Sequence, residues 1–296
     1  MTGISGIVPI LLTPFDKDEE IDFDSLRREV DLTLEAGVHG IGIAIGSEVF
    51  KLTQDERLRL LSAVADQVAG EVPLVMNTSA PGTEVATRLA VEAAEAGATR
   101  LMIWPPDFFP TGPDAVVEHL SRIATEAGLP IVLQDVPQSP ISPALANRIA
   151  NDVPLVDTIK VETQPTVEQV NAMVREAGER LTILGGAGGG TLVEEFRRGA
   201  RGTMPFASQS RDFMAVWTAL QDGDETEAER IIEARILPVS RLGFQGRDLF
   251  YHVHKGLLHK EGLFQTATVR MPTATPDATT RAEIDRLLDR WVTTTK

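Results

Sequence analysis

Short runs of apolar, often β-branched residues alternate with longer amphipathic stretches along the first 206 residues of the chain. The runs contain few charges, which is typical of parallel strands that are covered on both faces. The pattern predicts strands at residues 6–13, 40–45, 73–78, 99–105, 130–135, 157–161, 181–186 and 201–206.

The stretches between these runs contain helix start and stop signals. Residues 53–70 begin with Thr53, have Glu56 three positions later and end at Gly70, which is a capping box followed by a C-terminal glycine. Eight predicted strands, with a helix after each of the first seven, are typical of a (β/α)8 barrel. A doubly wound open sheet is the alternative. The barrel is favoured because no Gly-x-Gly-x-x-Gly motif follows the first strand.

After Phe206 the pattern of apolar residues becomes helical throughout, apart from a connector rich in proline and threonine. The sequence therefore predicts an α/β fold, a (β/α)8 TIM barrel with a C-terminal all-helical appendage. We expect the catalytic barrel domain to span residues 1–208 and the helical segment to span residues 209–296.

Composition and charge narrow the range of functions. The 296 residues carry a formal net charge of −15, so nucleic acid would be repelled and is not an expected partner. Cysteine is absent, which excludes disulfides, thiolate nucleophiles and cysteine-ligated metals. The sequence contains neither a signal-peptide pattern nor an apolar run of roughly 18–20 residues, so we expect a cytoplasmic protein without a membrane partner.

The five histidines and the absence of an HExxH motif give no metal site, and we expect neither a metal nor another cofactor.

The most informative stretch is VDTIKVET, residues 156–163, because it places Lys160 inside a strand that should be buried. Residues two apart in a strand share a face, so Glu162 should point the same way as Lys160. Burying a charged amine costs roughly several kcal/mol. This cost favours the uncharged form of the amine, which can attack a ketone. The alternative for Lys160 is a structural ion pair with Glu162. Glu162 in turn is either an acid–base group or a counter-ion.

A glycine run, GGAGGG at residues 185–190, follows the seventh predicted strand. Such a loop can bind phosphate through backbone N–H groups, but it contains no lysine or arginine. We therefore interpret it mainly as a place where the backbone approaches a substrate closely.

The chain resembles the dihydrodipicolinate synthase / N-acetylneuraminate lyase family, whose members form Schiff bases. The resemblance extends over nearly the whole chain and is carried by GIVPILLTPF, GSEVFKLTQDER, PLVMNTSA, WPPDFFP, PIVLQDVP and TIKVET. It implies that Lys160 forms the imine with a small 2-keto acid. It also implies that Gly46 and Ser47 hold the keto-acid carboxylate, partly through backbone N–H groups, and that Gly186 and Met204 line the pocket.

The family resemblance also implies a homotetramer or dimer of dimers. Exposed apolar residues such as Trp217 and Phe264 would be compatible with that assembly.

Two departures from the family pattern affect the expected reaction. Gln134 stands where members usually have a proton-relaying tyrosine, and Tyr251 is the only tyrosine in the chain. Ser139 stands where the synthase has an arginine for its second substrate. Both departures argue against dihydrodipicolinate synthesis. The segments SEVFKLTQDER, QDVP and KVET are more similar to the 2-keto-3-deoxy-L-arabonate dehydratase branch.

This resemblance implies dehydration of a 2-keto-3-deoxy sugar acid. Lys160 would condense with the C2 ketone, and Glu162 would remove a C3 proton and assist the loss of the C4 hydroxyl. Gln134 has no titratable proton, so it would position a water molecule or a substrate hydroxyl. An apolar wall formed by Trp104, Phe108 and Phe109 would admit a less polar or even an aromatic substrate.

Two alternatives remain open. One is a pyruvate-releasing retro-aldolase or hydratase-aldolase that uses the same lysine. The other is a catalytically silent sugar-acid-binding protein that has kept the barrel.

Overall fold

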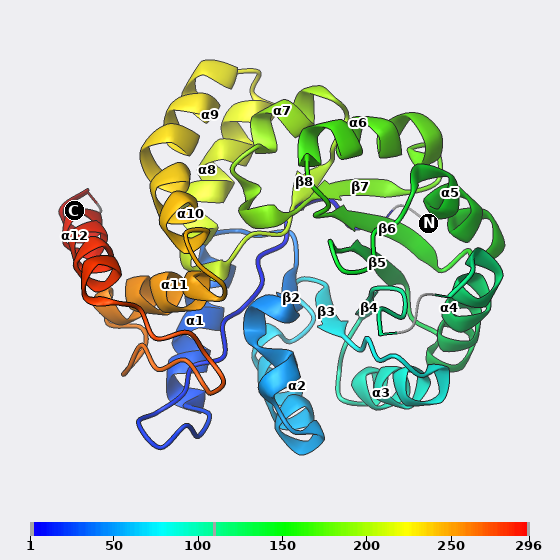
Figure 1. Ribbon diagram of the computed structural model, residues 1–296, viewed down its shortest axis with the longest axis horizontal. Coiled ribbons are helices and arrows are strands. Elements are labelled where there is room, and N and C mark those ends of the chain that lie inside the picture. Colours follow the sequence, from blue (N-terminus) through cyan, green and yellow to red (C-terminus); the bar gives the residue numbers. More distant parts are fainter. Residues whose placement is uncertain (1–2, 109–110, 295–296) are drawn as a thin grey trace.

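The computed structural model describes residues 3–108 and 111–294, and its centre is one curled sheet of eight parallel strands (Figure 1). The strands are β1 (Gly6–Ile7), β2 (Ile41–Ile43), β3 (Leu74–Asn77), β4 (Arg100–Ile103), β5 (Ile131–Asp135), β6 (Val156–Val161), β7 (Thr182–Gly185) and β8 (Gly202–Thr203). Their order in the sheet is β1-β8-β7-β6-β5-β4-β3-β2.

Backbone hydrogen bonds connect the two edges of this sheet. The N–H of Gly42 in β2 donates to the carbonyl of Pro9 at 2.8 Å, and the N–H of Leu11 donates to the carbonyl of Gly42 at 2.9 Å. The curled sheet with its surrounding helices is therefore consistent with the predicted (β/α)8 barrel.

The first and last strands are shorter than predicted, because proline interrupts each of them. Pro9 and Pro205 lack the N–H group that a ladder position must donate. The chain nevertheless stays aligned beyond β1, since the N–H of Ile10 donates to the carbonyl of Pro205 at 2.7 Å.

Seven helices follow the first seven strands in the described residues (Figure 1). They are α1 (Phe23–Glu35), α2 (Gln54–Val68), α3 (Thr83–Glu95), α4 (Pro113–Ala127), α5 (Pro143–Asp152), α6 (Thr166–Ala177) and α7 (Leu192–Arg197). The predicted capping box of α2 is confirmed, because Thr53 and Glu56 each accept a hydrogen bond from the backbone N–H of the other.

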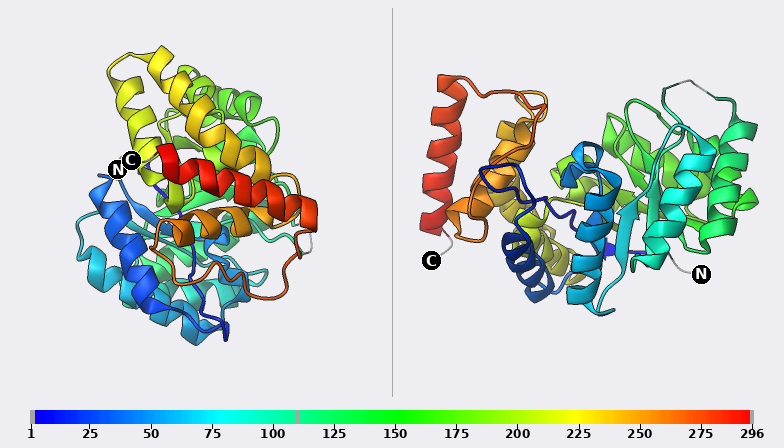
Figure 2. Two further views of the ribbon diagram at one scale, coloured as in Figure 1. Left: turned by 90° about the vertical axis from the view of Figure 1, so that its left-hand side faces the viewer. Right: turned by 90° about the horizontal axis from the view of Figure 1, so that it is seen from below.

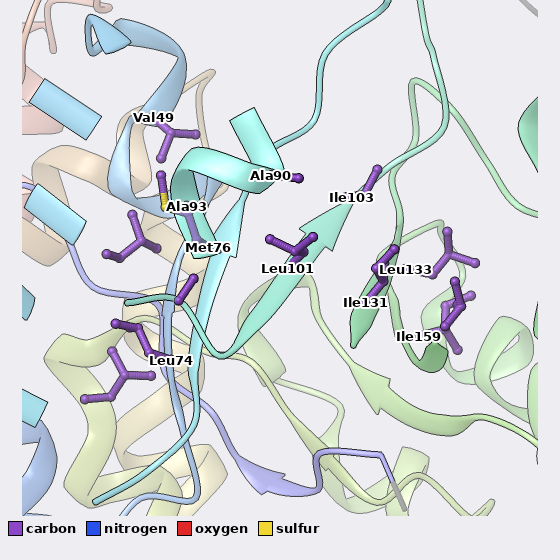
Figure 3. Close-up of a cluster of buried hydrophobic side chains, with 14 of the residues drawn as sticks. Val49, Leu74, Met76, Ala90, Ala93, Leu101, Ile103, Ile131, Leu133 and Ile159 are labelled. Atoms are coloured by element: carbon purple, nitrogen blue, oxygen red, sulfur yellow. The ribbon is translucent and has the colours of Figure 1, made fainter. Parts of the chain in front are cut away.

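The side chains of each strand alternate between two apolar layers. Leu74 and Met76 of β3 pack between the sheet and the helices, whereas Val75 packs with the residues that fill the interior of the curled sheet. Figure 3 shows part of the outer layer, which includes Ile159 of β6. Val161 belongs to the same outer layer, so Lys160 between them points into the interior.

The C-terminal residues form a group of helices on one side of the sheet (Figure 2). They are α8 (Ser210–Gln221), α9 (Glu225–Ile231), a π-helical turn (Ile232–Ile236), α10 (Leu237–Gly243), α11 (Leu249–Lys260) and α12 (Ala278–Thr294). In Figure 2, α12 lies on the outer side of α11, away from the sheet. No helix in the described ranges is long and apolar enough to cross a membrane.

Two details of this region bear on the sequence-based expectations. Phe213 and Val216 of α8 pack against Ile7 of β1, so this helix covers the sheet although it lies beyond the predicted domain boundary. Phe264 is not exposed as expected but buried, because it packs with Leu12 and Leu32.

Candidate active site

Strands β5 and β6 bring Gln134 and Lys160 side by side. The two residues are paired in the parallel ladder, so their side chains leave the same face of the sheet at the same level. Lys160 is 5 % exposed and Gln134 is 1 % exposed. Both therefore present polar groups on the face of the sheet that also carries Val75, Met102 and Val132.

Glu162 lies immediately beyond the C-terminal end of β6 and connects these two residues. Its Oε1 lies 3.0 Å from the Nζ of Lys160, and its Oε2 accepts a hydrogen bond of 2.6 Å from the Nε2 of Gln134. The backbone N–H of Ala187 also donates to Oε1, at 3.4 Å. The carboxylate is thus fixed between an amine and an amide, while its side chain keeps 20 % of its surface exposed.

A cavity of about 150 Å³ opens beside this group. Five of the seven predicted site residues line it, namely Gly46, Gln134, Lys160, Glu162 and Met204. The remaining lining residues in the described ranges are Ile10, Ile45, Ala187, Gly188, Pro205, Phe206, Phe244 and Phe250.

The other two predicted residues, Ser47 and Gly186, do not line the cavity. The hydroxyl of Ser47 donates to the carbonyl of Leu11, and its N–H donates to the carbonyl of Ala44 at 2.8 Å. Both polar groups of Ser47 are therefore engaged by the protein itself, and its role in binding a carboxylate stays a prediction.

Two glycines allow close packing at the site. A Cβ at Gly46 would lie 2.8 Å from the ring of Phe206, and a Cβ at Gly186 would overlap the Cγ of Glu162. Both positions leave no space for a side chain, because the neighbouring atoms already fill it.

Another carboxylate near the site, that of Glu195 in α7, is buried under the adjacent glycine of β7. A Cβ at Gly185 would overlap the Oε2 of Glu195, whereas Gly186 faces Glu162. Glu195 accepts a hydrogen bond of 2.8 Å from Thr191, and burial raises its pKa to about 6. It does not line the cavity.

The aromatic wall of the cavity differs from the one we expected. Phe206, Phe244 and Phe250 line the cavity, whereas Trp104 and Phe108 do not. Phe108 is 75 % exposed.

The third residue of the expected wall, Phe109, lies outside the described residues.

Phe244 and Phe250 lie at the end of α10 and in α11, so the C-terminal helices contribute to the site. Sequence reasoning missed this contribution, since aromatic residues at helical spacing usually indicate packing in a core.

The lone tyrosine does not replace the missing relay on β5. The hydroxyl of Tyr251 donates to the carbonyl of Ile45 at 2.6 Å, and burial raises the pKa of this phenol. Asp135, next to Gln134, points away from the site, because its carboxylate accepts hydrogen bonds from Ile141 and Thr163. Lys160, Glu162 and Gln134 are thus the polar side chains that line the cavity.

No metal centre is formed in the described part of the chain. No group of three or more His, Asp or Glu residues in residues 3–108 and 111–294 lies close enough to hold an ion.

A buried lysine and a carboxylate at the C-terminal ends of parallel strands, within a ring of helices, are typical of the active site of a barrel enzyme. The chain belongs to the dihydrodipicolinate synthetase family, whose model matches residues 3–290. Members of this family are lyases, so the protein is an enzyme of the lyase class. The family resemblance inferred from the sequence motifs is thereby confirmed.

Several relatives indicate the range of activities in this family. The chain is 29 % identical over 302 residues to L-2-keto-3-deoxyarabonate dehydratase of Azospirillum brasilense, covering 97 % of this chain and 96 % of that protein. It is 32 % identical over 211 residues to 4-hydroxy-tetrahydrodipicolinate synthase of Xanthomonas axonopodis, covering 70 % and 69 %. The crystal structure of dihydrodipicolinate synthase from Rhodopseudomonas palustris aligns with a TM-score of 0.86 and 29 % identity, covering 97 % of both chains.

Proposed function

We propose that the protein dehydrates a 2-keto-3-deoxy sugar acid, similar to 2-keto-3-deoxy-L-arabonate, through an imine on Lys160. The observation that carries this proposal is the position of Glu162, whose carboxylate lies between the Lys160 amine and the Gln134 amide. This arrangement provides a proton acceptor beside the carbon that an imine would activate. The similarity to L-2-keto-3-deoxyarabonate dehydratase along 97 % of the chain supports the same substrate class.

The first stage is imine formation. The Nζ of Lys160 attacks the C2 carbonyl of the keto acid, and one water molecule leaves as the carbon–nitrogen double bond forms. The positive iminium withdraws electrons from C3, so the C3 protons become acidic. Gly46 and the turn that contains it would face the C1 carboxylate.

The second stage is the elimination. Glu162 accepts a C3 proton, and the resulting enamine expels the C4 hydroxyl, which leaves as water with the proton from Glu162. For a five-carbon substrate, transfer of a C5 proton to C3 then produces an enol that is a tautomer of the C5 aldehyde. Hydrolysis of the imine releases the product, α-ketoglutarate semialdehyde, and restores the amine. Gln134 holds the carboxylate of Glu162 in place and presents its Oε1, which has no hydrogen-bond partner among the described residues, for a water molecule or a substrate hydroxyl.

The alternative reaction on the same lysine is cleavage of the C3–C4 bond, which would release pyruvate. The relatives named as synthases motivate this alternative. The two reactions differ in the proton that is removed, since cleavage requires a base for the C4 hydroxyl and dehydration requires a base at C3. The absence of a phenol beside Lys160 favours dehydration.

Borohydride reduction followed by peptide mass mapping tests the proposal. The enzyme is incubated with 2-keto-3-deoxy-L-arabonate or with pyruvate, reduced, digested and mapped, while a parallel sample is assayed for released semialdehyde and pyruvate. We expect an adduct on Lys160 and release of the semialdehyde. Lys260→Ala, which removes an exposed lysine paired with Asp289, is the matched control and should keep both signals.

Release of pyruvate and glycolaldehyde from the sugar acid would indicate that the protein is an aldolase and not a dehydratase. Binding of the sugar acid without turnover and without an adduct would indicate the silent binding protein instead.

We also propose a homotetramer or dimer of dimers, two domains that divide near residue 208, and a cytoplasmic location. Sedimentation analysis of the purified protein tests the assembly directly.

A further inference from the structure

The turn at residues 45–48 joins the cavity to the C-terminal helices. Gly46 lines the cavity on one side of this turn. On the other side, the hydroxyl of Tyr251 in α11 donates to the carbonyl of Ile45 at 2.6 Å. A residue of the C-terminal segment therefore holds the peptide group that precedes Gly46.

The last residue of the turn, Glu48, is fully buried and has a left-handed backbone conformation with φ of 55°. Non-glycine residues rarely adopt this conformation unless the surrounding structure enforces it. Its carboxylate forms ion pairs with Lys51, at 2.8 Å, and with Lys255 of α11. All three charged side chains are at most 3 % exposed.

The two lysines are themselves attached to the connector between α11 and α12. The Nζ of Lys51 donates to the carbonyl of Arg270 at 2.7 Å, and the Nζ of Lys255 donates to the carbonyl of Thr268 at 2.9 Å. Burial lowers the pKa of Lys255 to about 8, and the nearby carboxylate of Glu48 counteracts this effect.

A buried carboxylate that loses a partner is strongly destabilised, because water is not available to replace that partner. Moving the turn at residues 45–48 would require separating Glu48 from both lysines and breaking the hydrogen bond of Tyr251. The contacts that Tyr251 and Lys255 of α11 make with the turn thus oppose any displacement of Gly46 from the cavity wall.

We propose that Tyr251 and Lys255 are positioning residues, which hold the turn at residues 45–48 in the shape that receives the carboxylate of the keto acid. The inference rests on the proposed function, since it assumes that a keto acid binds beside Gly46. The C-terminal segment would then contribute to substrate binding and not only pack against the sheet.

The test uses the full-length protein and pyruvate as the probe. The pyruvate concentration that gives half-maximal borohydride trapping on Lys160 is measured for wild type, Tyr251→Phe and Lys255→Met. Thr33→Val is the matched control, because it also removes a buried hydroxyl that donates to a backbone carbonyl, at 2.7 Å, but within α1. Thermal unfolding of each variant is recorded in parallel.

We expect Tyr251→Phe to raise the half-maximal pyruvate concentration at least fivefold, and Lys255→Met at least tenfold. Thr33→Val should stay within twofold of wild type even if its unfolding temperature falls as far as that of Tyr251→Phe. If Lys255→Met fails to fold, Tyr251→Phe alone decides the question, because it removes one hydroxyl and leaves the ring in place.

The outcomes separate this inference from the proposed function. Equal trapping curves for Tyr251→Phe and Thr33→Val, with a normal adduct in wild type, would overturn the positioning role and leave the imine chemistry standing. Absence of any adduct in wild type would overturn the proposed function and the positioning role together.

Discussion

Replacing Glu162 with glutamine is the sharpest perturbation of the proposed mechanism. The substitution keeps the shape of the side chain and removes its ability to accept a proton. Two side chains donate to Glu162, through the Nζ of Lys160 at 3.0 Å and the Nε2 of Gln134 at 2.6 Å. A glutamine offers one oxygen and one NH2 group, so it can satisfy only one of these donors.

The magnitude of the effect follows from the role assigned to the carboxylate. A positioned acid–base group contributes about 10²–10⁴-fold in rate, which corresponds to about 3–5 kcal/mol of activation free energy. We therefore expect Glu162→Gln to lower kcat for dehydration by about this factor. Imine formation removes no proton from C3, so the substitution should leave it largely intact.

The assay measures the two stages separately on the same samples. Rapid mixing with the keto acid followed by borohydride reports the fraction of Lys160 trapped as an imine, and product analysis without borohydride reports turnover. Glu195→Gln is the matched control, because it neutralises another carboxylate next to β7, which is buried and lies outside the cavity. The control should turn over like wild type.

Two results would refute this reasoning. Turnover of Glu162→Gln within about threefold of wild type would show that another group moves the proton, since even the lower estimate requires about a hundredfold loss. Equal loss of trapping and turnover would show that Glu162 is needed to form the imine, which is a different role.

Three further predictions follow from the packing around the site. Gly186→Ala should lower kcat at least tenfold, because its Cβ would displace Glu162, and circular dichroism should show an otherwise unchanged fold; an unchanged kcat would contradict the assigned packing. Phe244→Ala should raise KM for the sugar acid with little change in the unfolding temperature, because Phe244 lines the cavity but is 62 % exposed; unchanged KM would remove it from the binding site. Glu195 has a pKa of about 6 in the folded protein, above its reference of 4.5, so it contributes stability below about pH 4.5 that is lost as the pH rises through about 6. We therefore propose urea unfolding of wild type and Glu195→Gln at pH 4.5 and at pH 7.5. Between these two pH values the unfolding free energy of the variant, relative to that of wild type, should rise by about 2 kcal/mol. A difference that does not depend on pH would contradict this.

The strands could be predicted because their pattern of apolar and polar residues depends on neighbours in the sequence. Ile159 and Val161 are apolar and β-branched, and alternation along a strand then forces Lys160 to the opposite face. The same alternation predicted that Glu162 lies beside Lys160, and their atoms are 3.0 Å apart. Strand ends were less predictable where proline removes a backbone donor, as at Pro9.

Contacts between distant segments could not be read from local periodicity. Phe244 and Phe250 line the cavity although they belong to the C-terminal helical segment, and nothing in their own helical pattern indicates this contact. The contact between Tyr251 and Ile45 has the same origin. The orientation of Ser47 was hidden for a related reason, since its hydroxyl is directed by Leu11, which belongs to another segment.

The most direct measurement of the central claim is the mass of the Lys160 peptide after reduction with borohydride in the presence of pyruvate. We predict one reduced adduct per chain, located on Lys160 and absent from Lys160→Ala, whose turnover should fall to background. A reduced adduct on a different residue, or full turnover by Lys160→Ala, would contradict it.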